Sequence, residues 1–223
     1  MIKIFIITER RADYSRFKPI MSLIQKDKEL DYILTVTGAH LKKEMGYTKN
    51  EILKDGFKIH YEIDMFTENN DSTGEMVRSF ARVAEKVTYC LEDCNPDVIL
   101  AGFDIGANLA VSIAGAHMNI PVAHIQGGEV TGTIDESIRH AMSKFSHYHF
   151  TSNDDALRRL VKMGEVRNRI FNVGCPSIDA ILNTPDNPKI LEKYNLKENE
   201  YFILLQHPVT SEIDQSGNQI QIT

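Results

Sequence analysis

Short apolar runs alternate with amphipathic segments along most of the chain. The runs at residues 2–8, 31–38, 97–103 and 120–126 are rich in β-branched, aliphatic and aromatic side chains. Such continuous runs are typical of strands that are covered on both faces, as in parallel sheets. Further strands are expected at 56–63, 147–152 and 168–174. Because helical patterns separate the strands, we expect an α/β fold with a doubly wound, parallel, Rossmann-like sheet.

The longest amphipathic segment predicts a helix that begins at residue 72 or 73. Ser72 or Thr73 can cap its first turn, and the Asn95–Pro96 pair ends it. Helical spacing places one set of side chains on the buried face, namely Met76, Phe80, Val83, Val87 and Leu91.

The pattern changes after residue 175. Residues 176–200 form a polar, proline-containing link, and an apolar run that reads as a fresh strand begins at residue 201. We therefore predict a Rossmann-like N-terminal domain at 1–175, a linker at 176–200, and the start of an incomplete, Rossmann-like C-terminal domain at 201–223.

Three chemically dense stretches each follow a predicted strand directly. They are "TERRADYSR", "AGFDIG" and "HIQGGE", which begin at Thr8, Ala101 and His124. In doubly wound sheets ligands bind at the carboxyl ends of the strands, so these stretches are expected to converge on one edge.

The first stretch presents Arg10, Arg11 and Arg16 together with Asp13 between a strand and a helix. Arginines beside a helix N-terminus suit a diphosphate or carboxylate group. The alternative is a surface turn held by salt bridges. Neither a dinucleotide-binding glycine fingerprint nor a P-loop is present in the sequence.

The second and third stretches carry acidic residues at strand ends. Asp104 can reach the ligand crevice or can cap the next helix. Gln126 and Glu129 flank Gly127 and Gly128, whose missing side chains let the backbone approach a ligand closely.

A helix is expected to follow the glycine pair. Near its start, Asp135 faces Arg139 at i, i+4, and Glu136 and His140 lie beside them. A structural role is a strong alternative here, since a carboxylate in the first turn complements the helix dipole.

Histidines and cysteines do not form a metal motif. His147 and His149 alternate in a predicted strand, and we expect these residues and His124 to be partly buried and hydrogen-bonded rather than metal ligands. Cys90 and Cys94 lie four apart on a helix, where packing is favoured over a zinc site.

Composition narrows the class of protein. The chain has 223 residues, a formal net charge of −6 and three cysteines. This charge offers no basic field for nucleic acid or an anionic membrane, so an anionic ligand must be held by local arginines. The odd cysteine count suits a reducing compartment. The first apolar run is too short for a signal peptide or a membrane span, so we expect a cytoplasmic protein.

Several motifs together resemble one family. These are "RADYSRFKPIM", "VTGAH", "HIQGGEVTGTIDESIRHAMSKFSHYHFTS", "VGCPSID" and "LQHPVT". In this order they resemble the hydrolysing UDP-N-acetylglucosamine 2-epimerases, including the epimerase half of the bifunctional enzyme of sialic acid synthesis. The resemblance implies two Rossmann-like domains that face each other across a cleft, the glycosyltransferase-B arrangement.

The resemblance also implies a reaction. UDP leaves UDP-N-acetylglucosamine by anti elimination across C1 and C2, and water then adds to the unsaturated sugar to give N-acetylmannosamine for nonulosonic (sialic-type) acid synthesis. An alternative substrate is UDP-N,N'-diacetylbacillosamine, which leads to legionaminic acid. No metal or other cofactor is expected, because arginines and helix ends can meet the charge of the leaving diphosphate.

Residue roles follow from the same resemblance. The implied catalytic residues are Asp104, Glu129, Asp135 and His207, and the implied substrate-binding residues are Arg11, Arg16, Gln126, Gly127, Gly128 and Arg139. Gln126 departs from the family, because many members have glutamate there. This departure shifts the acid/base assignment towards Glu129 and Asp135. "AGFDIG" likewise departs from the commoner "HGDR" form, and this affects the contacts to the sugar.

Relatives of this family continue well past the position that corresponds to residue 223. We therefore expect a chain that is truncated within the second domain and inactive by itself, and a homo-oligomer, dimer or tetramer, at full length. Two other classes stay open: a glycosyltransferase of the same fold, and a non-catalytic module that binds nucleotide sugars.

Overall fold

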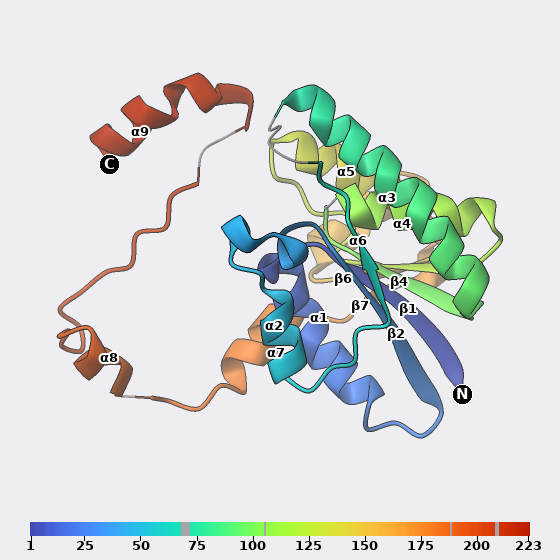
Figure 1. The fold of residues 1–223 in the computed structure, drawn as a ribbon, viewed down its shortest axis with the longest axis horizontal. Helices are drawn as coiled ribbons and strands as arrows, with labels where there is room; N and C mark the ends of the chain where they lie inside the picture. The colour runs from blue at the N-terminus through green and yellow to red at the C-terminus, as the bar shows by residue number, and fades with distance from the viewer. Residues whose placement is uncertain (68–71, 105, 188, 208–209) are drawn as a thin grey trace. The chain divides into compact units, whose positions relative to one another are not determined.

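The computed structural model describes residues 1–223 except 68–71, 105, 188 and 208–209 (Figure 1). Its strands are β1 Ile2–Thr8, β2 Leu30–Thr37, β3 Tyr61–Ile63, β4 Val98–Gly102, β5 Val122–Ile125, β6 Tyr148–Thr151 and β7 Ile170–Asn172. Its α-helices are α1 Arg11–Ile24, α2 Lys49–Lys54, α3 Thr73–Cys94, α4 Gly106–His117, α5 Ile134–Phe145, α6 Asp154–Lys162, α7 Pro176–Leu182, α8 Lys189–Lys193 and α9 Ser216–Ile222.

The described strands form one parallel sheet in the order β3-β2-β1-β4-β5-β6-β7. The sheet therefore grows outward from β1 in one direction and from β4 in the other, which is the doubly wound arrangement expected from the sequence. Figure 1 shows α1 and α2 on one side of this sheet and α3 and α4 on the other. The neighbouring strands β1 and β4 mark the topological switch point.

Each face of the sheet has its own apolar core. Phe5 and Ile7 of β1 point to the cluster that contains α3 and α4, whereas Ile6 points to the cluster that contains α1. This alternation explains the continuous apolar run in β1, because a strand buried on both faces needs apolar residues at every position. Cys90 and Cys94 pack against the first cluster, as expected, and burial raises the pKa of both thiols, that of Cys94 to about 11.

Two elements differ in length from their predicted ranges. The helix α1 begins at Arg11, so most of the segment expected as a turn is helical. The reason is that both carboxylate oxygens of Asp13 accept backbone N–H groups, from Glu9 and Arg10 at 2.8 Å each, and so cap the new helix. The third strand covers only Tyr61–Ile63 of the predicted 56–63.

The long helix α3 is capped by Ser72 as predicted, since its side chain accepts the N–H of Glu75. One prediction for its buried face is wrong: Met76 is 61% exposed, whereas Glu75 is buried. Glu75 tolerates burial because arginine side chains neutralise its charge.

The chain divides into two compact units, Met1–Ala180 and Ile181–Thr223. In the second unit, residues 201–207 are exposed and do not form the predicted strand. A strand needs a neighbour to pair with, and the described residues of this unit contain none. The division at 175 and 200 stays a prediction. Among the described helices, none is both long and apolar enough to cross a membrane.

Candidate active site

The carboxyl ends of β1, β4, β5 and β6 bring polar side chains to one edge of the first unit, as the sequence predicted. Asn108 of α4 ties the two strands at the switch point together. Its Oδ1 accepts the N–H of Gly102 at 3.0 Å, and its Nδ2 donates to the carbonyl of Ile7 at 3.3 Å. One side chain of α4 therefore holds the ends of β1 and β4 together at this edge.

The arginines that follow β1 take different positions. Arg11 is exposed at the start of α1. The guanidinium carbon of Arg16 lies 4.7 Å from the centre of the Phe103 ring, which places Arg16 beside the end of β4. Within the described residues, Arg10, Arg11 and Arg16 form no ion pair, so the alternative of a salt-bridged turn does not describe this segment.

Arg139 connects the ends of β4 and β5. It is buried, forms an ion pair with Asp104, and donates from Nη1 to the carbonyl of Glu129 at 3.0 Å. The expected pairing of Asp135 with Arg139 is not found in the described part of the chain, because Arg139 turns inward to Asp104. Asp135 lies in the first turn of α5 and is partly exposed.

The glycine pair is shaped by packing within the protein. A Cβ at Gly127 would lie 2.9 Å from Nδ1 of His124, and a Cβ at Gly128 would collide with the carbonyl oxygen of Ala156. Gly128 also takes a left-handed backbone, and its carbonyl accepts a hydrogen bond from Arg159 of α6. Their role in binding a ligand stays a prediction.

Glu129 is held by two neutral donors. Nε2 of Gln126 lies 3.3 Å from Oε1 of Glu129, and the hydroxyl of Ser152 donates to the same oxygen. Gln126 Nε2 also lies 3.4 Å from Sγ of Cys175. Sequence reasoning missed Ser152 and Cys175, although both follow strands, β6 and β7, whose carboxyl ends reach the same edge.

Glu9 is a third residue at this edge that the sequence did not single out. Its Oε2 accepts the N–H of Ala107, in the first turn of α4, at 3.1 Å. Burial raises the pKa of this carboxyl to about 7. Glu9 immediately follows β1, and the strand-end rule that selected Asp104 could have found it.

The histidines near the site are hydrogen-bonded, as expected. His124 is fully buried between the hydroxyl of Ser143 at 3.1 Å and the carbonyl of Phe103 at 3.2 Å. Burial lowers the pKa of His124 to about 3. His147 accepts the N–H of Val122, and His149 pairs with Glu165. Over the part of the chain that the structure describes, no group of three or more metal-binding side chains is found.

His207 belongs to the second unit and is exposed.

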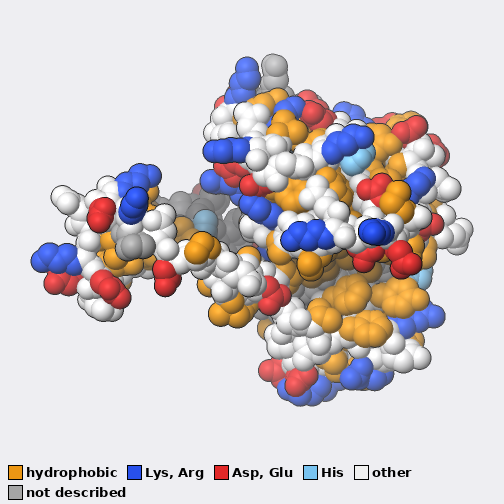
Figure 2. All heavy atoms as spheres, turned by 90° about the horizontal axis from the view of Figure 1, so that it is seen from below, with side chains coloured by type: hydrophobic (Ala, Val, Ile, Leu, Met, Phe, Trp, Pro, Cys, Tyr) orange, Lys and Arg blue, Asp and Glu red, His pale blue; other side chains and the backbone are white. Residues whose placement is uncertain are grey.

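An apolar cavity of about 460 Å³ lies elsewhere on the first unit. It opens on the face of the sheet that carries α1, and its wall includes Ile4, Ile20, Val98 and Tyr148. Figure 2 shows hydrophobic side chains gathered in a hollow of the surface. Because Ile4 and Val98 lie towards the amino ends of their strands, this cavity is separate from the polar edge.

Comparison with known proteins identifies the family. Residues 22–222 match the family model described as UDP-N-acetylglucosamine 2-epimerase, so the chain belongs to this family. It is 36% identical over 222 residues to the hydrolysing UDP-N,N'-diacetylbacillosamine 2-epimerase of Legionella pneumophila. This match covers 98% of this chain and 59% of that protein. It is 35% identical to the UDP-N-acetylglucosamine 2-epimerase of Neisseria meningitidis, over 95% of this chain and 56% of that protein.

Solved structures agree on the fold. The UDP-N-acetylglucosamine 2-epimerase of Rickettsia bellii matches with a TM-score of 0.76 and 23% identity, over 100% of this chain and 58% of that one. The Neisseria meningitidis enzyme bound to UDP-GlcNAc matches with a TM-score of 0.72 and 22% identity. This match covers 81% of this chain and 48% of that one. The chain thus spans about half the length of the curated relatives it matches, and its Rossmann-like fold is confirmed.

Proposed function

We propose that this protein is a hydrolysing UDP-sugar 2-epimerase that converts UDP-N-acetylglucosamine and water to N-acetylmannosamine and UDP. The observation that carries the proposal is the convergence of the Asp104 carboxylate and the Glu129 backbone carbonyl on Arg139 at the carboxyl edge of the sheet. An elimination next to a leaving diphosphate needs a base near C2 and groups that stabilise developing charge. Carboxylates and arginines at one edge supply both.

The proposed reaction has two stages. In the first, a carboxylate takes the proton from C2, the C1–C2 double bond forms, and the C1–O bond breaks with its electron pair on UDP. In the second, the hydroxyl of water adds to C1 and a proton returns to C2 from the opposite face. Asp104, Glu129, Asp135 and His207 are the proposed acid/base residues.

The proposed binding residues divide by what they offer. Arg11 and Arg16 follow β1 and suit the diphosphate, since guanidinium groups bind phosphate oxygens in a bidentate way. Gln126, Gly127 and Gly128 form the loop under the sugar, and Arg139 holds Asp104 and the Glu129 backbone in place. No metal or other cofactor enters the proposed mechanism.

UDP-N,N'-diacetylbacillosamine is the second candidate substrate. The relatives from Legionella pneumophila and Campylobacter jejuni that are named for it are 36% and 35% identical to this chain. The UDP-N-acetylglucosamine enzyme of Neisseria meningitidis is 35% identical, so identity alone does not separate the two sugars. Either product would feed nonulosonic acid synthesis in the cytoplasm, and a homo-oligomer is the proposed assembly.

The test follows UDP release and deuterium incorporation by NMR in D2O. It uses a protein of the relatives' full length that contains these 223 residues, with this chain alone in parallel. We expect free N-acetylmannosamine with deuterium at C2 from the long protein, unchanged by a chelator, and no turnover by the chain alone, since it covers 56% to 59% of its relatives.

The outcomes separate the candidate functions. If the enzyme turns over UDP-N,N'-diacetylbacillosamine but not UDP-N-acetylglucosamine, the second candidate is the substrate. Release of free sugar without an acceptor excludes a glycosyltransferase. Binding of both sugars without release of UDP would overturn the proposal in favour of a non-catalytic module.

A further inference from the structure

The hydrogen bonds around Glu129 distinguish it from the other acidic residues of the site. We propose that Glu129 is the base that takes the proton from C2, that Ser152 is a positioning residue for it, and that the amide oxygen of Gln126 contacts the sugar. This inference rests on the proposed function and adds the assignment of the proton-transfer step.

The direction of the hydrogen bond from Ser152 is set by the cap of α6. Oδ1 of Asn153 accepts the N–H of Ala156 at 2.9 Å, which leaves the amide nitrogen Nδ2 to donate to Oγ of Ser152 at 3.3 Å. Because Ser152 Oγ already accepts from Asn153, its own proton is directed at Glu129. The chain of bonds therefore runs from the helix N-terminus to the Glu129 carboxylate.

Gln126 supplies a second donor to the same carboxylate oxygen. Its Nε2 lies 3.3 Å from Oε1 of Glu129 and 3.4 Å from the sulfur of Cys175. Both donors thus act on Oε1, and in the described part of the chain no hydrogen bond is made to Oε2. A carboxylate that is fixed through one oxygen can present the other to a substrate in a defined direction.

The other two carboxylates at this edge have different surroundings. Asp104 is ion-paired with buried Arg139, so protonation of Asp104 would leave an unpaired buried guanidinium. Asp135 lies in the first turn of α5 and is partly exposed. Among the described residues, the carboxylate of Glu129 is contacted by an amide and a hydroxyl and forms no ion pair.

Gln126 also leaves an unmet acceptor in the site. The residue is 6% exposed, and its Oε1 is buried without a hydrogen-bond partner among the described residues. A buried carbonyl oxygen without a donor is costly, and an N–H or O–H of a bound sugar would satisfy it. Gln126 therefore links the sugar to the Glu129 carboxylate through the two ends of one amide.

The proton transfer balances without any further reactant. The proton moves from C2 to Oε2 of Glu129, and the electron pair of the C2–H bond forms the C1–C2 double bond. The electron pair of the C1–O bond leaves with UDP.

The first experiment compares Ser152→Ala, Ser152→Thr and the control Ser22→Ala in the full-length enzyme. Ser22 is partly exposed in α1, and among the described residues its hydroxyl bonds to the carbonyl of Lys18 in the same helix. We expect Ser152→Ala to lower kcat about tenfold with KM nearly unchanged, because a hydrogen bond to a charged group is lost. The kinetic isotope effect with substrate deuterated at C2 should rise, and Ser152→Thr should restore part of kcat.

The second experiment addresses Glu129 and Gln126. Glu129→Gln should lower kcat at least about 100-fold while the dissociation constant of the UDP-sugar, measured by calorimetry, changes less than about threefold. Gln126→Met removes both ends of the amide, so it should lower kcat and also raise KM.

These measurements can overturn the inference in three ways. Glu129→Gln that still incorporates deuterium at C2 at the wild-type rate would assign the base to another residue. Ser152→Ala with unchanged kcat and isotope effect would remove its positioning role, and unchanged KM in Gln126→Met would remove the sugar contact. A wild-type enzyme that releases no UDP would instead refute the proposed function, so the two failures are distinguishable.

Discussion

Gly128 and Gly132 lie in the same loop and both take a left-handed backbone, with φ of +82° and +71°. Their surroundings differ. A Cβ at Gly128 would collide with the backbone of α6, whereas a Cβ at Gly132 would meet nothing within 4 Å. The pair therefore separates the cost of the backbone conformation from the cost of a steric clash.

We expect Gly132→Ala to reduce the free energy of unfolding by about 1 kcal/mol, from the left-handed backbone alone. Gly128→Ala should cost about 2 to 4 kcal/mol, since displacement of α6 adds to the same backbone strain. Urea denaturation of the two variants measures both values. Equal losses would show that the loop moves away from α6 without cost.

At the residue scale, strand-end placement could be predicted but pairing could not. Asp104, Gln126 and Glu129 lie at the predicted edge, because each follows an apolar strand. The partner of Arg139 was predicted on its own helix, four residues away, but the structure pairs it with Asp104. Helical spacing describes neighbours on one helix only, and a buried guanidinium is attracted to whichever carboxylate packing brings within reach.

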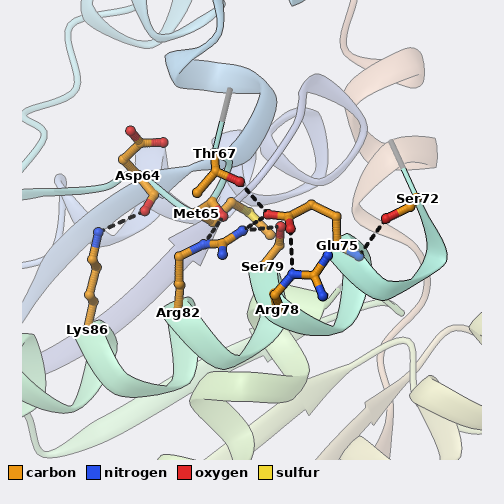
Figure 3. A network of polar contacts seen from close by, with 9 residues as sticks. All are labelled: Asp64, Met65, Thr67, Ser72, Glu75, Arg78, Ser79, Arg82 and Lys86. Carbon is orange, nitrogen blue, oxygen red and sulfur yellow. Dashed lines mark hydrogen bonds and ion pairs between the residues drawn. The ribbon is translucent and has the colours of Figure 1, made fainter. Parts of the chain in front are cut away.

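At the element scale, α3 is anchored by a buried carboxylate. Figure 3 shows Glu75 surrounded by Arg78, Arg82 and Thr67. Arg78 Nε and Thr67 Oγ1 each lie 2.8 Å from the carboxylate, and Arg82 also donates to the carbonyl of Met65 at 2.7 Å. The network fastens the segment after β3 to the first turns of α3.

Hydrogen bonds from Arg78, Thr67 and Arg82 lower the pKa of Glu75 to about 2. Because the folded-state pKa is below the usual value of 4.5, the stabilisation is fully present above pH 4.5 and is lost as the pH falls towards 2. We expect Glu75→Gln to lower the melting temperature at pH 6 and to match the wild type more closely at pH 3. Thermal unfolding at both values is the measurement.

Met76→Ala is the matched control on the same helix. Met76 is exposed, so its truncation should change the stability by less than about 0.5 kcal/mol at either pH. A Glu75→Gln deficit of the same size at pH 3 and pH 6 would contradict an ionised, arginine-paired Glu75.

At the scale of the whole molecule, buried histidines connect stability to pH. His40 lies between the hydroxyls of Thr8 at 3.0 Å and Thr48 at 2.7 Å. Burial lowers the pKa of His40 to about 4 and that of His124 to about 3. Below about pH 6.5 the unfolded chain binds protons that the folded chain does not, so these residues make stability fall as the pH falls.

Each such histidine contributes a slope of up to about 1.4 kcal/mol per pH unit between pH 6.5 and its folded pKa. Glu9 acts in the opposite direction over part of this range, because its raised pKa of about 7 favours the folded state at lower pH. The informative quantity is therefore the difference between variants. His124→Gln should flatten the pH dependence of urea denaturation between pH 7 and 5 relative to the wild type.

Sequence alone determined the order of strands and helices, the doubly wound sheet, the edge that carries the polar loops and the resemblance to the epimerases. These features can be predicted from short windows of sequence. A strand that is buried on both faces must be apolar, and the apolar positions of a helix repeat within a few turns.

The tertiary structure decided which polar groups meet. Asp104 and Arg139 are 35 positions apart, and Glu129 and Ser152 are 23 apart. It also decided that Glu75 rather than Met76 faces inward, and that residues 201–207 form no strand. The physical reason is the same in each case. A charge can be buried, or a strand can form, only when groups from elsewhere in the chain supply hydrogen-bond partners, and the local sequence pattern does not specify those partners.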